Sequence, residues 1–223
     1  MTKAISLKNC LFSYTKNSKL VINIDQLEIE TGDKVFLYGP SGHGKSTLLN
    51  LTAGVLKANS GSVEVLGHDL TKLGQSGRDH LRGEKIGYIF QIFNLIPYLS
   101  VKENIVLPCM INKKRSDSDF HKQAEELIDS LGLREHLDKP VTDLSIGQQQ
   151  RVAAARALIG NPEMIIADEP TSALDEKNTA EFMNLLMKVW EQKKFTLIFV
   201  SHDERLRSYF NRSISLPEIN HHD

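Results

Sequence analysis

One glycine-rich stretch constrains the fold of this chain more than any other feature. It reads Gly39-Pro40-Ser41-Gly42-His43-Gly44-Lys45-Ser46 and is followed by Thr47. Two of its glycines are five residues apart and precede a lysine and a hydroxyl, which is the spacing of a phosphate-binding P-loop. An apolar run, Val35–Tyr38, comes before it, and a helix-like run, Thr47–Leu51, comes after it. A strand, a tight turn and a helix start are therefore predicted, whereas a chance glycine turn would need no such context.

The residue types of this stretch suit a nucleotide phosphate. Gly39, Gly42 and Gly44 can adopt positive φ and allow close backbone approach, so successive N–H groups can point into one concavity. The helix that opens there adds free N–H groups and the positive end of its dipole. We expect Lys45 to reach the β- and γ-phosphates and the Ser46 hydroxyl to join the coordination shell of Mg²⁺.

The bulk properties of the chain exclude several classes of protein. Its 223 residues are 40% hydrophobic and 25% charged, with a net charge of -1, so no broad basic surface for nucleic acid is expected. Cys10 and Cys109 are far apart, without metal-ligand spacing, as in a reduced cytosolic protein. No apolar window approaches the length of a membrane span, and the N-terminus lacks a signal peptide, so work at a membrane would need a partner.

The segments before and just after the P-loop predict antiparallel strands. Residues 3–11 and 20–30 alternate apolar and polar side chains, and Gly61–Gly67 reads as a hairpin. Between the first two strands lie Phe12 and Tyr14. This pair could be aromatic core of a hairpin, or Tyr14 could stack on a nucleotide base.

The middle of the chain changes character after a strand over residues 86–90 that ends at Gln91. An apolar loop, Ile92–Pro97, follows, and residues from about 101 to 160 read mainly as helix. Apolar positions from Phe120 to Leu131 fall on one helical face, which Gly132 ends. We interpret this block as a helical insertion into an α/β domain.

The segment Asp143–Gln150 leads into an alanine- and arginine-rich helix. Ser145 stands where an N-cap would, and Gly147 leaves backbone N–H groups uncovered. This helix start could bind an anion, although, taken alone, the local pattern is explained better by an ordinary capped helix.

Two later strands end in polar residues. The buried run Met164–Ala167 leads into Asp168 and Glu169, the Walker B arrangement, in which Asp168 would hold Mg²⁺. Strand alternation would turn Glu169 the other way and free it to polarise a water. Thr196–Val200 is expected to be the last parallel strand, and His202 follows it at an edge where α/β proteins bind ligands. The tail from His221 to Asp223 is expected to fray.

With these residues in view, the chain resembles the nucleotide-binding subunit of an ATP-binding cassette (ABC) transporter. The resemblance runs from Tyr14 to His202 and rests on six features in the expected order: Tyr14, the P-loop, Gln91, the signature segment Ser145–Gln148, Asp168-Glu169 and His202. A closer similarity is to lipoprotein-releasing, macrolide-export and cell-division ATPases, on the segments Phe90–Pro97, Asn104–Pro108 and Gln148–Val152.

The resemblance implies a role for each matched position. Tyr14 would stack on adenine, Lys45 and the P-loop amides would bind phosphates, and Ser46 with Asp168 would place Mg²⁺. Gln91 would sense the γ-phosphate and metal and link the site to a transmembrane partner. Glu169 would be the general base, and His202 would contact the γ-phosphate. Ser145 and Gly147, within the signature that ends at Gln148, would bind the γ-phosphate held by a second copy, so two copies would pair head to tail around ATP.

Two positions depart from the family's usual pattern. Ile146 stands where the signature has glycine, and its branched side chain restricts the backbone. We expect activity to survive because Ser145 and Gly147 are retained, with slower or looser closure of the dimer. His43 is less usual in a P-loop, but its side chain can point outward.

The resemblance implies an α/β fold: a P-loop NTPase core with a parallel sheet, an N-terminal antiparallel β subdomain and an inserted helical subdomain. We expect one domain over 1–223, with the core in 1–91 and 161–217 and the helical subdomain in 92–160. It would be an ATPase, working as a homodimer with ATP and Mg²⁺, that powers a membrane transporter of exporter or lipoprotein-extruding type. It would be cytoplasmic and held at the inner face of the membrane by permease subunits, with no nucleic acid partner.

Three alternatives stay open from the sequence. A soluble ABC ATPase of DNA repair, chromosome maintenance or translation would carry coiled coils, zinc modules or a second cassette, which this chain lacks. A nucleotide sensor without activity would not need Glu169 and His202. In the apolar loop, Phe93, Leu95, Ile96 and Tyr98 would form part of a groove for a permease helix, or else pack internally.

Overall fold

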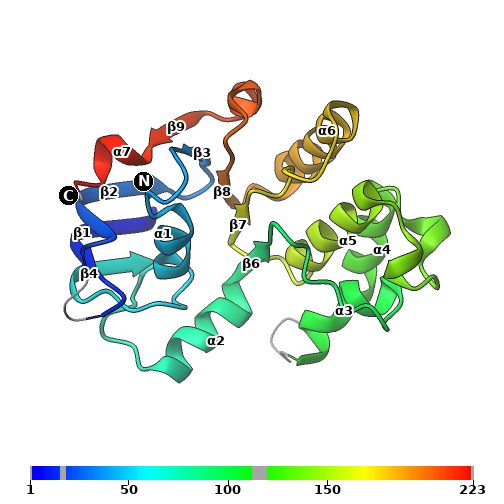
Figure 1. The fold of residues 1–223 in the computed structure, drawn as a ribbon. Helices are drawn as coiled ribbons and strands as arrows, with labels where there is room; N and C mark the ends of the chain where they lie inside the picture. The colour runs from blue at the N-terminus through cyan, green and yellow to red at the C-terminus, as the bar shows by residue number, and fades with distance from the viewer. Residues whose placement is uncertain (1, 16–18, 112–119, 222–223) are drawn as a thin grey trace. The chain divides into compact units, whose positions relative to one another are not determined.

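The structure of the chain is a computed structural model that describes residues 2–15, 19–111 and 120–221. Its contacts divide the chain into two compact units. The first unit comprises residues 1–82 and 196–223, and the second comprises residues 83–195. The first unit is therefore built from both ends of the chain, as the run of colour in Figure 1 shows. The boundaries 92–160 expected for a helical subdomain stay a prediction.

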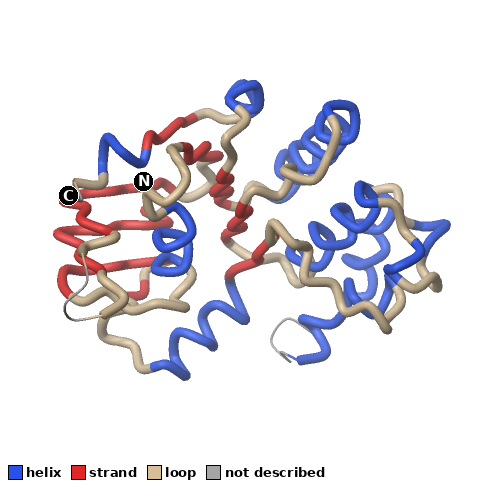
Figure 2. The backbone as a smooth tube through the Cα atoms, in the orientation of Figure 1, coloured by secondary structure: helices blue, strands red, loops and turns tan. Residues whose placement is uncertain are grey.

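An antiparallel sheet forms one layer of the first unit, as the alternating patterns predict. Its strands, which Figure 2 draws in red as it does all strands, are hydrogen-bonded in the order β2-β1-β4-β5. Residues Ile5, Leu7 and Cys10 of β1 lie buried, so the sheet supplies core side chains. The bounds are β1 (Lys3–Phe12), β2 (Ile22–Glu30), β4 (Ser60–Val65) and β5 (His68–Asp69). The antiparallel subdomain expected from the sequence is confirmed.

Parallel strands form the second layer of this unit. The central strand is β3 (Lys34–Tyr38), and it pairs in parallel with both β8 (Thr196–Val200) and β9 (Arg212–Ser215). The prediction that Thr196–Val200 is the last parallel strand is therefore wrong. Only Ile214 of β9 is buried, because this short edge strand has polar residues at its other positions and thus carries no clear apolar pattern.

Helix α1 (Lys45–Thr52) lies between these two layers. Its Leu48 and Leu49 are buried and share one core region with side chains of β1, β2, β3, β8 and β9. This packing fixes the start of α1, which is the end of the glycine-rich loop. The unit also contains a 3₁₀ turn, η4 (Glu204–Tyr209), and a short helix, α7 (Leu216–Ile219).

The second unit contains two parallel strands and a group of helices. Strand β6 pairs with β7 in parallel, with Ile89 opposite Ala167. The amphipathic helix expected from Phe120 is present, with Ala124, Leu127 and Ile128 buried. The bounds are β6 (Ile86–Ile89), α3 (Val101–Ile111), α4 (Phe120–Ser130), η2 (Arg134–His136), η3 (Val141–Asp143), α5 (Ile146–Leu158), β7 (Met164–Asp168) and α6 (Glu176–Lys193).

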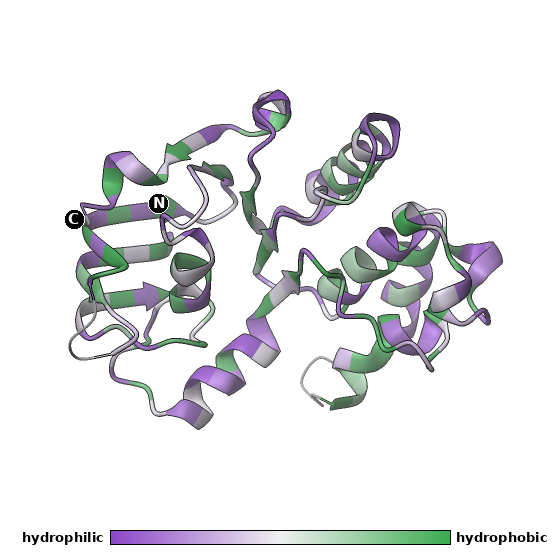
Figure 3. Ribbon diagram, in the orientation of Figure 1, coloured by the Kyte–Doolittle hydropathy of each residue, from purple (hydrophilic) through white to green (hydrophobic). Residues whose placement is uncertain are grey.

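Two parts of the chain differ from expectation. Helix α2 (Gln75–Lys85) was not evident from the sequence, because most of its side chains are polar (purple in Figure 3) and only Leu81 is buried. The expected fraying of the tail is wrong for His221, whose backbone N–H donates to the Asn23 carbonyl at 2.8 Å. His222 and Asp223 lie outside the described residues. In the described part of the chain, no helix combines the length and apolarity that crossing a membrane requires.

Candidate functional site: a nucleotide-binding loop and a signature helix

The glycine-rich loop joins β3 to α1 as its spacing predicts. Gly42 and Gly44 have φ values of 81° and 90°, in the left-handed region that favours glycine. Gly44 is the N-cap of α1, and no side chain caps that helix start. The first N–H groups of α1 are therefore left for another acceptor, as an anion site at a helix N-terminus requires.

Lys45 closes the loop on itself. Its Nζ donates to the carbonyl oxygens of Gly39 at 2.7 Å and Pro40 at 3.0 Å. Both contacts place the ammonium group over the loop, where it would meet a phosphate. His43 Nδ1 lies 3.2 Å from the Ser41 carbonyl oxygen, so this side chain folds back on the loop backbone. Ser46 is exposed.

The two aromatic residues ahead of the loop have different environments. Phe12 is buried in the core, whereas Tyr14 is 62% exposed. The rings meet edge to face with centroids 5.0 Å apart, and the Tyr14 hydroxyl lies 3.0 Å from Oγ1 of Thr47. The core interpretation thus fits Phe12. Tyr14 instead stands beside the first turn of α1 as an exposed aromatic side chain, which suits stacking on a base.

His202 leaves the same edge of the parallel strands as the loop. Leu37 of β3 is in register with Val200 of β8, and the Ser201 N–H donates to the Leu37 carbonyl. Because carboxyl ends of neighbouring parallel strands meet at one edge, His202 is exposed on the side where the loop begins. The first unit therefore brings together Tyr14, the glycine-rich loop and His202.

In the second unit, three further candidate residues lie at or beyond the ends of β6 and β7. Ile89 is opposite Ala167, so Gln91 and Asp168 leave the same edge of this strand pair. Burial, followed by the charge of the Asp168 carboxylate and a hydrogen bond to it, raises the pKa of Tyr88. Tyr88 was not singled out from the sequence, because an aromatic residue in a strand normally indicates core.

Glu169 stands beyond the end of its strand. Strand β7 ends at Asp168, and Glu169 has φ 47°, so its direction follows from a left-handed backbone and not from strand alternation. A glutamate in this region carries conformational strain of order 1–3 kcal/mol, which is typical of residues at functional sites. The expectation that Glu169 and Asp168 are oriented differently therefore rests on this backbone conformation and not on strand alternation.

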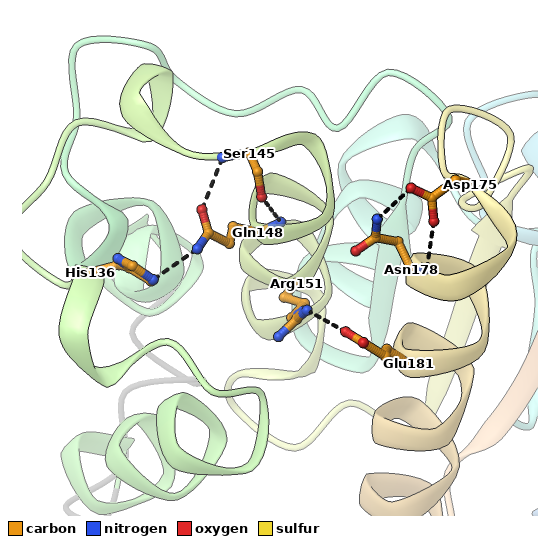
Figure 4. A network of polar contacts seen from close by, with 7 residues as sticks. All are labelled: His136, Ser145, Gln148, Arg151, Asp175, Asn178 and Glu181. Carbon is orange, nitrogen blue, oxygen red and sulfur yellow. Dashed lines mark hydrogen bonds and ion pairs between the residues drawn. The ribbon is translucent and has the colours of Figure 1, made fainter.

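The signature segment forms a capped helix start (Figure 4). Oγ of Ser145 accepts from the Gln148 N–H at 3.3 Å, and Oε1 of Gln148 accepts from the Ser145 N–H at 2.9 Å, which together make a capping box. The carboxamide of Gln148 also lies 2.9 Å from Nε2 of His136. His136 thus steadies the first turn of α5, a role that no local sequence pattern indicates.

The start of α6 packs against this turn. Asp175 caps α6 by accepting from the Asn178 N–H at 2.8 Å. Hydrogen bonds from Asn178 lower the pKa of the Asp175 carboxyl. A Cβ placed on Gly147 would lie 3.0 Å from Oδ1 of Asn178. The buried Gly147 therefore lets α5 and α6 approach closely. Arg151 of α5 also meets Glu181 of α6, with 3.2 Å between Nη2 and Oε2 (Figure 4).

Ile146 has an ordinary helical backbone. It is the first residue of α5 and does not have the positive φ that would demand glycine. Its side chain is 52% exposed. The isoleucine is therefore accommodated without backbone strain in this chain, and only its exposed side chain distinguishes it from the usual glycine.

Side chains of two helices, α5 and α3, bind the backbone of the apolar loop after Gln91. The guanidinium of Arg156 donates to the carbonyls of Phe93 at 2.6 Å and Asn94 at 2.7 Å, and burial lowers the pKa of Arg156. The fully buried Asn104 accepts from the Ile96 N–H at 2.8 Å and donates to the Ile96 carbonyl. The loop backbone is thus fixed, while its tips at Ile92 and Tyr98 are 80% and 83% exposed.

Comparison with known proteins identifies the family. The model of the ABC transporter family matches residues 22–172. The chain belongs to the ABC transporter family. It is 37% identical over 192 residues to the lipoprotein-releasing system ATP-binding protein LolD 1 of Rhodopseudomonas palustris, covering 86% of this chain and 85% of that protein. It is 38% identical to the bacitracin export ATP-binding protein BceA of Halalkalibacterium halodurans, covering 91% of this chain and 79% of that protein.

A solved structure agrees with this assignment. The dimeric structure of the ATP-binding cassette MJ0796, in a post-hydrolysis state bound to ADP and Pi, is 36% identical with a TM-score of 0.83. It covers 95% of this chain, and this chain covers 93% of it. The predicted fold is thereby confirmed. As a member of this family, the chain is an ATPase that binds ATP and couples its hydrolysis to transport.

Proposed function

We propose that two copies of this chain pair head to tail around ATP and drive an exporter-type membrane complex. The observation that carries the pairing is the display of the signature: Ser145 and Ile146 are exposed at a rigid, capped helix start. A dimer of MJ0796, at 36% identity, supports the same arrangement. Light scattering with ATP and without it tests the pairing, and a chain that stays monomeric with ATP would contradict it.

Each site residue then takes one part of the work. The amides of Gly39 to Thr47, with Lys45, would bind the phosphates, and Tyr14 would stack on adenine. Glu169 would take the proton of the attacking water, while Gln91 and His202 would contact the γ-phosphate. Ser145, Gly147 and the helix start completed by Gln148 would bind the γ-phosphate held by the second copy.

Each unit offers side-chain oxygens of the type that Mg²⁺ binds. Among the described residues, no group of three or more His, Cys, Asp and Glu side chains could hold a metal ion. A magnesium ion that arrives with ATP needs no such group, because it keeps waters and binds one or two carboxylates together with phosphate oxygens. The Asp168 carboxylate, the Ser46 hydroxyl and the Gln91 carbonyl oxygen are the hard oxygen ligands that would hold it. The ion would neutralise phosphate charge during hydrolysis.

Replacing Ile146 by glycine is expected to tighten the ATP-driven dimer. The exposed branched side chain stands between Ser145 and Gly147, where the second copy's nucleotide would approach. Relieving such overpacking is worth about 1 kcal/mol, so the dimer should form at about fivefold lower protein concentration. Titration of protein against ATP by light scattering measures this. Val55→Gly is a control because Val55 is 52% exposed in the first unit, and an equal effect of both variants would contradict the proposal.

We propose further that the apolar loop binds a helix of a permease subunit, which would hold the chain at the cytoplasmic face of a membrane. A hollow of 310 Å³ is lined by Ile92, Phe93, Leu95 and Pro97, and by Val141 and Gln149 from the signature side. The sequence grouped Ile96 and Tyr98 with this groove. Neither lines this hollow: the Ile96 N–H donates to Asn104, and Tyr98 is exposed, so their part in the groove stays a prediction. Names such as LolD and BceA favour an exporter or lipoprotein-releasing partner.

Replacing Leu95 by aspartate is expected to lower recruitment to permease-containing membranes at least about tenfold, because a charge placed in an apolar contact must be desolvated. ATP binding by the purified chain should be unchanged. Co-sedimentation with membranes that carry the permease measures recruitment. Met110→Asp is the matched control, since Met110 is 70% exposed in the same unit and away from the hollow. Recruitment of Leu95→Asp at the wild-type level would contradict docking at this loop.

A further inference from the structure

The buried Asn220 connects the C-terminal segment to the glycine-rich loop. It follows α7 and is 4% exposed. Its Oδ1 accepts from the Asn23 N–H at 2.7 Å. Its Nδ2 donates to the carbonyl oxygens of Val21 at 3.0 Å and His43 at 3.2 Å. One carboxamide thus joins the start of β2 to the middle of the loop.

One end of the loop contacts this segment, and the other end contacts Val21, which Asn220 also binds. A Cβ on Gly39 would lie 3.0 Å from Cδ of Pro217, so the loop's first residue packs against α7. A Cβ on Gly44 would lie 2.9 Å from the Val21 carbonyl oxygen, which is the same oxygen that Asn220 binds. The loop therefore lies against a surface made by Val21 and α7, and Asn220 is the polar link in it.

The contact with His43 has a direct geometric consequence. A trans peptide is planar, and its C=O and N–H groups point in opposite directions. The described part of the chain has no cis peptide bond. Holding the His43 carbonyl therefore aims the Gly44 N–H away from Asn220. Gly44 is the N-cap of α1, whose side-chain cap is absent, so this N–H is among those that the loop offers to a phosphate.

We propose that Asn220 is a positioning residue for nucleotide binding: it holds the His43–Gly44 peptide so that the Gly44 N–H is aimed before ATP arrives. The inference rests on the proposed binding of phosphates by this loop. Asn220 itself does not touch nucleotide in this proposal. Its effect is preorganisation, because without it the loop would have to order its backbone on binding.

Asn220→Asp tests the donor half of this contact alone. The carboxylate keeps an acceptor for the Asn23 N–H but faces the Val21 and His43 carbonyls without a proton to donate. Since a buried hydrogen bond left unmade costs a factor of about ten, we expect the Kd and KM for Mg-ATP to rise about tenfold, with kcat changed less. Binding of a fluorescent ATP analogue and steady-state hydrolysis measure these values.

Acidification supplies a rescue of the lost donor, which ties the change in Kd to this one contact. The introduced carboxyl faces two carbonyl oxygens, so its protonated form is favoured and its pKa lies above the usual value. Protonation restores a donor. The ratio of variant to wild-type Kd should therefore fall as pH is lowered from 8 to about 5.5, within the range of such raised values.

Asn211→Ala is the matched control. Asn211 is also an asparagine of the C-terminal segment that binds backbone in the first unit, accepting from the Lys34 N–H at 2.7 Å at the opposite end of β3. Its loss should lower the melting temperature while changing the Kd less than about twofold. Hydrogen exchange of residues 39–46 without nucleotide should be faster in Asn220→Asp and unchanged in Asn211→Ala.

Each outcome decides between the proposals. If wild type and Asn211→Ala bind ATP and Asn220→Asp binds it equally well, the positioning role is wrong and the loop's function stands. If Asn211→Ala weakens binding as much as Asn220→Asp, Asn220 contributes only stability. If wild type fails to bind ATP, the proposed function itself fails. Should Asn220→Asp not fold, Asn220→Ala, which also removes the donor, takes its place in the same comparison.

Discussion

Glu169→Gln is expected to reduce ATP hydrolysis by about 10²- to 10⁴-fold, the usual contribution of a general base. Glutamine has the size of glutamate and occupies the left-handed backbone at φ 47° with the same difficulty, so the local structure should be kept. What it lacks is a carboxylate that can take a proton from water. ATP binding should persist, and the variant should accumulate as an ATP-bound dimer.

Steady-state hydrolysis and light scattering with ATP measure the two halves of this prediction. Glu163→Gln is the matched control, because Glu163 precedes the same strand β7 and forms a surface ion pair with Lys85 at 2.9 Å. Such pairs contribute at most about 1 kcal/mol to stability, so this control should hydrolyse ATP at the wild-type rate. A Glu169→Gln chain that hydrolyses as fast as wild type and traps no dimer would show that the base is another group.

Lys45→Ala is expected to raise the Kd for Mg-ATP about ten- to hundredfold. A hydrogen bond to a charged group is worth about 1.5–3 kcal/mol, which corresponds to that factor. In the structure the ammonium group is bound to the carbonyls of Gly39 and Pro40, so it needs no large movement to meet a phosphate. The variant loses this loop contact as well as the charge.

A second substitution separates these two losses. Lys45→Arg keeps the charge in a planar group of different shape, and its Kd should lie between those of wild type and Lys45→Ala. Lys57→Ala, which removes an exposed lysine of the same unit, should bind as wild type does. Equilibrium binding of a fluorescent nucleotide gives all four values. Equal affinity of Lys45→Ala and Lys57→Ala would remove Lys45 from the proposed site.

Features that depend on residues close together in the sequence could be predicted from the sequence. The loop from Gly39 to Thr47, the cap at Ser145 and the strand leading to Asp168 depend on neighbours within a few residues. The same holds for the alternating strands β1 and β2 and the apolar face of α4. In each case local spacing decides both the element and the chemical groups it presents.

Features made by distant residues were not accessible. Strand β9 has too few apolar positions to be predicted from the sequence. It becomes a strand because β3 has an open edge with which it can pair. Helix α2 is mostly polar, and its single buried leucine does not make an apolar face from which a helix could be predicted. The left-handed backbone of Glu169 replaces the alternation that the sequence suggested.

The sequence by itself predicted a phosphate-binding glycine-rich loop, because the groups of that loop are adjacent along the chain. The order of its motifs resembles ABC ATPases, and the ABC transporter family is the one that the comparison shows. The tertiary structure decided what stands around the loop. The Tyr14 hydroxyl reaches Oγ1 of Thr47, and strand pairing places His202 at the edge where the loop begins. Asn220 reaches the His43 carbonyl across 177 residues. No pattern of neighbouring residues encodes such a contact, since it exists only once the first and last parts of the chain fold into one unit.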